Sequence, residues 1–182
     1  MGLVVTTLIS GPAIASEEAE YAAQARSLMK EFGQELKQTL THAMKSGGPI
    51  AALESCNTKA PVMAQEAMSN SSWSIGRTSL KIRSAVNKPD AWEQQVLEDF
   101  EARKLAGEDP KKMEFFETIT LDGKPSFRYM KAIPTGKACL NCHAAEIKPE
   151  IAKKIQMLYP NDQARGFEIG DIRGAFTLRK TL

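Results

Sequence analysis

Apolar residues recur at helical spacing through the first third of the chain. From Ser16 they return every three or four positions over roughly thirty residues, which is the repeat of one face of an α-helix. These positions are Tyr21, Ala25, Leu28, Phe32, Leu36, Leu40 and Met44. Gly47-Gly48-Pro49 ends the pattern, and shorter helices are predicted at 50–57 and 62–68, with Pro61 between them.

The pattern changes to β-strand spacing after Trp73. Residues 74–83 alternate in their second half, with Thr78, Leu80 and Ile82 on one face, which predicts a half-buried strand. A hairpin is predicted from 113–120 and 125–133, because aromatic and β-branched residues flank an Asp-Gly turn. A last strand is predicted at 171–178.

Two helices lie between these strands. Asp90 can cap a helix over 91–106, and a second helix is predicted over 149–158. Helices first, followed by strands, predict an α+β fold with a mostly antiparallel sheet. A long N-terminal helix and a small sheet flanked by helices are also the layout of PAS-like sensor modules, by analogy of fold.

Length, charge and the N-terminus restrict the class of protein. At 182 residues the chain is predicted to form one domain over 16–182. A net charge of +2, from 24 basic and 22 acidic residues, argues against nucleic acid as a main partner. Residues 1–15 are mostly apolar and end in Ala13-Ile14-Ala15, as a secretory signal peptide does. The basic residues that normally begin such a peptide are missing, since no Lys or Arg precedes Leu3, so the true start is expected upstream. We expect a bacterial periplasmic protein without a stable membrane span after cleavage.

The strongest chemical signal is Cys139-Leu140-Asn141-Cys142-His143. Cys-x-x-Cys-His is the attachment site of a c-type haem, in which two thiols bind the porphyrin and the imidazole ligates the iron. A thioredoxin-like redox pair is the first alternative, but Pro134, Gly136 and Lys137 precede the motif where a buried strand would be needed. A structural zinc site is the second, and the usual partner pair of ligands is absent from a sequence with two histidines and three cysteines.

Longer motifs carry a resemblance to a known family. They are Gly76-Arg77-Thr78-Ser79-Leu80-Lys81-Ile82-Arg83, Asn87-Lys88-Pro89-Asp90-Ala91-Trp92-Glu93, the Cys-x-x-Cys-His run, Tyr159-Pro160-Asn161-Asp162-Gln163-Ala164-Arg165-Gly166-Phe167, and Gly170-Asp171-Ile172-Arg173-Gly174-Ala175-Phe176. In this order they resemble a periplasmic family of single-haem c-type, PAS-like proteins catalogued as a domain of unknown function. Its members stand alone or form the sensing part of chemotaxis receptors and histidine kinases. The resemblance implies iron ligation by His143 and Cys56, and one local departure is Ala144, where many members have glycine.

The residues alone leave the sixth iron ligand open. Cys56 is preferred because it is otherwise an odd thiol in an oxidising compartment. His42 is the other histidine, but its place near a helix end is typical of a solvated residue, and an open site is also considered. The methionines that could ligate are Met44, Met63, Met68, Met113 and Met130, although such residues mostly fill cores.

Arginines are the candidates for binding the haem propionates. A planar guanidinium pairs with a carboxylate through two bonds, and the candidates are Arg77, ranked first, Arg83, Arg128 and Arg173. Aromatic residues could wall the porphyrin or simply pack in the core; these are Trp73, Phe127, Tyr129 and Tyr159.

The expected function is that of a non-enzymatic haem protein carrying one covalent haem c. A thiolate ligand in a PAS-like domain favours a sensor of redox state or of a diatomic gas, since loss of Cys56 on reduction would open the iron. The alternative is a small periplasmic electron-transfer cytochrome with a redox partner protein, suggested by a chain that stops at Leu182 directly after the last strand. A haem peroxidase is disfavoured because it would need His42 as its distal acid-base residue.

Overall fold

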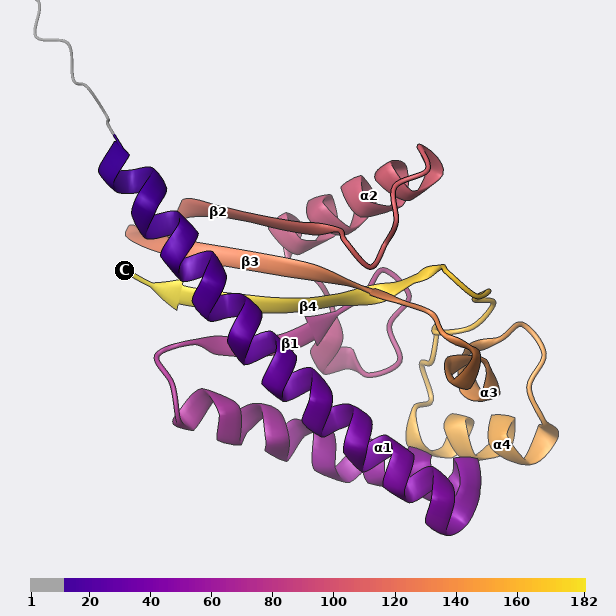
Figure 1. The fold of residues 1–182 in the computed structure, drawn as a ribbon. Helices are drawn as coiled ribbons and strands as arrows, with labels where there is room; N and C mark the ends of the chain where they lie inside the picture. Colours follow the sequence, from indigo (N-terminus) through magenta and orange to yellow (C-terminus); the bar gives the residue numbers. More distant parts are fainter. Residues whose placement is uncertain (1–11) are drawn as a thin grey trace, which may run out of the picture.

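The computed structural model describes the backbone of residues 12–182, and the side chains from residue 17 onward. Of the predicted signal peptide, residues 1–11 lie outside the described part. The described chain forms a four-stranded antiparallel sheet with helices on both faces (Figure 1). The predicted α+β, PAS-like class is confirmed. None of the helices in residues 12–182 combines the length and apolarity that crossing a bilayer requires.

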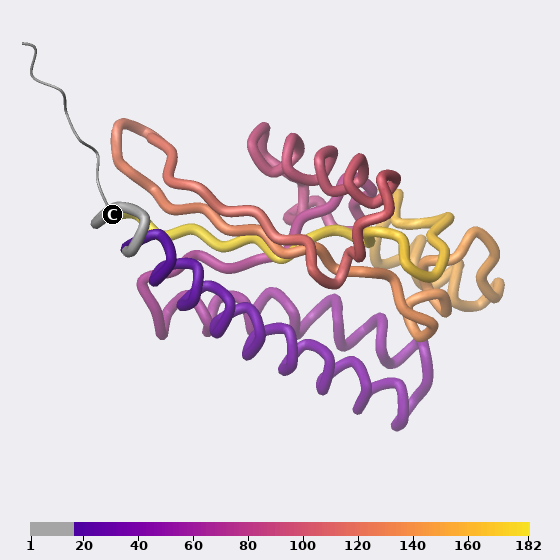
Figure 2. The backbone as a smooth tube through the Cα atoms, turned by 45° about the horizontal axis from the view of Figure 1, so that its top comes forward, coloured from indigo at the N-terminus to yellow at the C-terminus, as the bar shows by residue number. Residues whose placement is uncertain are grey.

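The first element, α1 (Pro12–Ser69), consists of two helical segments that run side by side in opposite directions (Figure 2). The chain reverses at Gly47 and Gly48, and Gly48 adopts φ 68° and ψ −162°, a conformation that favours glycine. The predicted stop at this point is confirmed. The predicted break at Pro61 is wrong: the second segment stays helical through Pro61, because buried Ala60 and Met63 on either side hold it against the core.

The sheet has the strand order β1-β4-β3-β2, and every neighbouring pair is antiparallel. Its strands are β1 (Ser74–Thr78), β2 (Glu114–Leu121), β3 (Lys124–Pro134) and β4 (Ile172–Thr181). Asp122 and Gly123 both have positive φ in the predicted β2–β3 turn. The strand predicted over 74–83 ends early, because the Ser79 hydroxyl accepts a hydrogen bond from the Lys81 amide at 3.2 Å and turns the chain.

Each face of the sheet carries its own core. Both segments of α1 contribute to the core on one face; the buried residues there are Ala22, Ala25, Phe32, Met63, Trp73, Ile75, Phe127, Tyr129 and Leu178. Helix α2 (Ala91–Leu105), closed at its start by the predicted Asp90 cap in a capping box with Glu93, covers the other face. Its core consists of Val96, Leu97, Phe100, Met113, Met130, Ala132, Ile172 and Ala175.

Gly174 allows β4 to pass close to the end of β1. Its φ is 155°, and a Cβ at this position would lie 2.3 Å from the Thr78 carbonyl oxygen. We expect Gly174→Ala to lower the free energy of unfolding by about 2–4 kcal/mol, through backbone strain and overpacking. Chemical denaturation measures this. Gly76→Ala in β1 is the matched control, because its Cβ would meet Thr177 at an ordinary 3.9 Å; equal losses in the two variants would contradict the account.

Candidate cofactor site

The Cys-x-x-Cys-His motif lies at one end of the sheet, where β3 leaves it (Figure 1). The 3₁₀ turn η2 (Lys137–Cys139) continues directly into the one-turn helix α3 (Leu140–His143). The predicted helical turn is therefore present across Cys139, Cys142 and His143. A helix, α4 (Pro149–Leu158), follows at the residues predicted for it, and its buried Ile151 and Ile155 form a small core beneath the site.

All five predicted site residues line one cavity. Its volume is about 890 Å³, which is within the range of about 300–1,000 Å³ typical of cofactor sites. Cys139, Cys142 and His143 line it from the motif, Cys56 from the second segment of α1, and Arg77 from β1. Segments that are far apart in the sequence are thus brought together at a single site.

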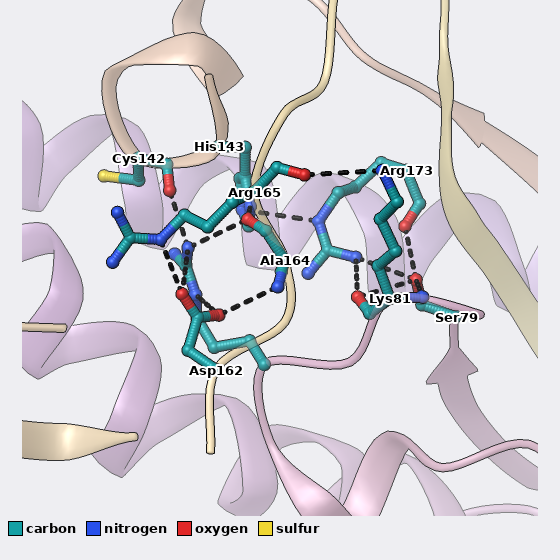
Figure 3. A network of polar contacts seen from close by, with 9 residues as sticks. Ser79, Lys81, Cys142, His143, Asp162, Ala164, Arg165 and Arg173 are labelled. Atoms are coloured by element: carbon teal, nitrogen blue, oxygen red, sulfur yellow. Dashed lines mark hydrogen bonds and ion pairs between the residues drawn. The ribbon is translucent and has the colours of Figure 1, made fainter. Parts of the chain in front are cut away.

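His143 is held in one tautomer. Its Nδ1 lies 2.8 Å from the Ala164 carbonyl oxygen, and because a carbonyl can only accept, Nδ1 carries the proton (Figure 3). Burial, with the charges of Arg173 and Arg83, lowers the pKa of His143 to about 3. The ring is therefore neutral, and Nε2 keeps the lone pair that a metal needs. The Arg173 Nε approaches this atom at 3.4 Å, a long contact that metal ligation at Nε2 would replace.

A buried ion pair connects the motif to the loop after α4. Arg83 Nε donates to Asp162 Oδ1 at 2.9 Å, and the two side chains are only 10% and 3% exposed. Arg165 donates to the other oxygen of Asp162 at 2.7 Å. Burial raises the pKa of Asp162, but the bonds from Arg83 and Arg165 outweigh it and hold the pKa below its ordinary value.

The role of this ion pair is not predictable from local sequence. Asp162 and Arg83 both fall within motifs of the family resemblance, but nothing in the sequence indicates that they pair. The Tyr159-Pro160-Asn161-Asp162 segment after a helix is the only signal that could have pointed to a structured loop.

Cys56 is positioned by packing between helices. Leu53, one turn earlier, packs with Ile151 and Ile155 of α4, and Glu54 forms an ion pair with Lys154. The thiol is half-buried; burial raises its pKa, and the charges of Arg77 and Arg83 partly oppose this effect. A charge on Cys56 also raises the pKa of Cys142, whose own burial has the larger effect. Because Cys56 and Cys142 line the same cavity, the third thiol of the chain lies near the motif.

Arg77 differs from the other candidate arginines in having no polar partner among residues 17–182. Arg83 is paired with Asp162, and Arg128 is paired with Asp90 and Glu93. Arg173 donates to the Ser79 hydroxyl and the Lys81 carbonyl. Arg77 lines the cavity from β1, where it sits directly opposite Phe176, and burial lowers its pKa. Such a guanidinium is available to an anionic group inside the cavity.

Most of the other candidates for the sixth iron ligand lie outside the cavity. His42 is exposed and does not line the cavity. Met63, Met113 and Met130 are buried in the two cores on the sheet faces. Met44 and Met68 do line the cavity, so two thioethers remain beside Cys56.

The four aromatic residues that were candidates for contacting the porphyrin also lie in two different places. Of these four residues, Tyr159 alone lines the cavity, whereas Trp73, Phe127 and Tyr129 belong to the core under α1. Phe32, which sequence reasoning placed only on a helix face, also lines the cavity. It meets Phe176 edge-on, with the ring centroids 6.1 Å apart.

An antiparallel sheet with a Cys-x-x-Cys-His turn opening onto a cavity of this size defines a class of cofactor-binding α+β domains. The family model described as Tll0287-like matches residues 13–180, and the chain belongs to this family. The resemblance drawn from the sequence motifs is confirmed.

One solved structure is similar over most of its length. The cyanobacterial heme-protein Tll0287 matches with a TM-score of 0.62 and 22% sequence identity, covering 87% of this chain and 94% of that chain. This likeness supports the fold described above. No curated protein matches.

Proposed function

We propose that this chain is a c-type haem protein, with one haem bound covalently through Cys139 and Cys142 and its iron ligated by His143 and Cys56. The observation that carries the proposal is the single cavity lined by these four residues and by Arg77. The solved relative is described as a heme-protein, which agrees with this use of the cavity. The donor set fits the group: two thiols at the attachment spacing, a neutral imidazole, a further thiol and an unpaired cation.

Each residue has a separate task. Cys139 and Cys142 hold the porphyrin edge from one helical turn. His143 presents Nε2 to the iron because its Nδ1–H is fixed on Ala164. Arg77 would bind a propionate, and Cys56 would supply the second iron ligand from the second segment of α1, which Leu53 packs against α4.

We infer a sensing role from the identity of the sixth ligand. A bound haem supplies one-electron chemistry and, where an axial position is free, binding of diatomic gases. A Cys56 thiolate would favour ferric iron, so its release on reduction would be the two-state switch. His42, on which a peroxidase would depend, is exposed and does not line the cavity, and we therefore propose a non-enzymatic role. We propose the bacterial periplasm as its location because residues 1–15 have the sequence pattern of a secretory signal peptide.

Carbon monoxide added to the reduced protein tests this role. We expect the Soret band to shift, because Cys56 leaves the ferrous iron and the gas takes its place. Met44→Leu is the control, since it changes a cavity residue that the proposal does not make a ligand. An unchanged Soret band, together with fast and reversible voltammetry, would overturn the sensor and favour the electron-transfer cytochrome.

A further inference from the structure

The Ala164 carbonyl oxygen has two donors. It accepts from His143 Nδ1 at 2.8 Å and from Arg83 Nη2 at 3.3 Å. The same Nη2 donates to the carbonyl of Cys142 at 2.6 Å. The Arg83 guanidinium therefore contacts the backbone of residues 139–143, which we call the attachment turn. It also contacts the Ala164 carbonyl oxygen, which orients the His143 ring. Figure 3 shows Cys142, His143, Ala164 and Asp162 gathered around this point.

Asp162 fixes the arrangement from the other side. Besides pairing with Arg83, its Oδ1 accepts from the backbone N–H of Ala164 at 3.1 Å. Both the amide and the carbonyl of Ala164 are thus held by this buried ion pair. The backbone N–H of Phe167 also donates to the His143 carbonyl at 3.0 Å. The loop after α4 is therefore hydrogen-bonded to the motif at several points.

We propose that Arg83 is a positioning residue that tunes the electron-donating strength of His143 through the Ala164 carbonyl, an inference that rests on the proposed haem function. A carbonyl that is shared with a cation accepts more weakly from a second donor. The His143 N–H is then less polarised, and Nε2 is a weaker donor to iron. Weaker donation, together with a nearby positive charge, favours ferrous over ferric iron. Arg83 accordingly raises the reduction potential and fixes the plane of the imidazole ring.

The matched comparison is Arg83→Gln against Arg165→Gln. Both variants remove one cation from the same Asp162 carboxylate, but Arg165 makes no hydrogen bond to Ala164 or Cys142 among the described residues. We expect Arg83→Gln to reduce the equilibrium constant for one-electron reduction at least tenfold, about 59 mV. Its ferric electron paramagnetic resonance g values should change as well. Arg165→Gln should shift the potential less and leave the g values unchanged.

Equal shifts in the two variants, or unchanged g values in Arg83→Gln, would overturn the inference while leaving the haem function intact. Arg83→Lys covers the case in which Arg83→Gln does not fold. It keeps a cation beside Asp162 but cannot bridge the carboxylate and both carbonyls, so its potential should fall and its g values should change. An Arg83→Lys protein identical to wild type would also overturn the inference. Wild-type protein without covalent haem is a different result, which would reject the proposed function and the inference together.

Discussion

Replacing Cys139 and Cys142 together by serine is expected to abolish covalent attachment of haem. In the proposed site each thiol forms one bond to the porphyrin, and no other cysteine lies within residues 137–143. The variant should show no haem on a denaturing gel stained for haem, whereas wild type should keep it. Acid-acetone extraction should likewise remove any colour from the variant.

Cys56→Ser is the control for this experiment. It removes the remaining cysteine, which lies on α1 outside the motif, and should keep covalent haem at the wild-type level. Retention of haem by the double variant on the denaturing gel would contradict the assignment. Loss of haem from Cys56→Ser alone would show that the third cysteine takes part in attachment.

The same Cys56→Ser variant is expected to lose completely the ferric signal that a thiolate ligand gives. A serine hydroxyl is a weak ligand compared with a thiolate, so the iron should become high-spin or take another ligand from the cavity. Electron paramagnetic resonance of the ferric protein measures this directly. The expected effect is all-or-none rather than graded, because in the proposed site the substitution changes the atom that ligates the iron.

Two variants separate Cys56 from its competitors. Met44→Leu removes a thioether that lines the cavity, and His42→Ala removes the exposed histidine. Both should keep the wild-type ferric spectrum. If Met44→Leu changed the spectrum and Cys56→Ser did not, the sixth ligand would be the thioether, and the sensor proposal would lose its physical basis.

Local signals made much of this fold predictable. The Gly47-Gly48 stop, the Asp90 cap and the Asp122-Gly123 turn each act within a few residues, so sequence alone places them. The attachment turn is equally local, because three residues within five positions define it. These features are predictable since each depends on backbone conformations that few residue types adopt.

Long-range contacts were not predictable in the same way. Apolar alternation continues to Ile82, yet β1 ends at Thr78, where the Ser79 hydroxyl accepts from the nearby Lys81 amide and also donates to the Arg173 carbonyl 94 positions away. Pro61 lacks an N–H, but buried neighbours keep its helix intact. The pairing of Arg83 with Asp162 joins residues 79 positions apart. In each case, packing of the whole domain overrides or supplements the local pattern.

The most direct test of the account is mass spectrometry of the tryptic peptide that begins at Ala138 and contains both cysteines of the motif. In protein purified from a host that attaches haem outside the cytoplasm, we predict that this peptide carries the added mass of one haem. A peptide with the mass of its amino acids alone, from protein that is folded and exported, would contradict the account.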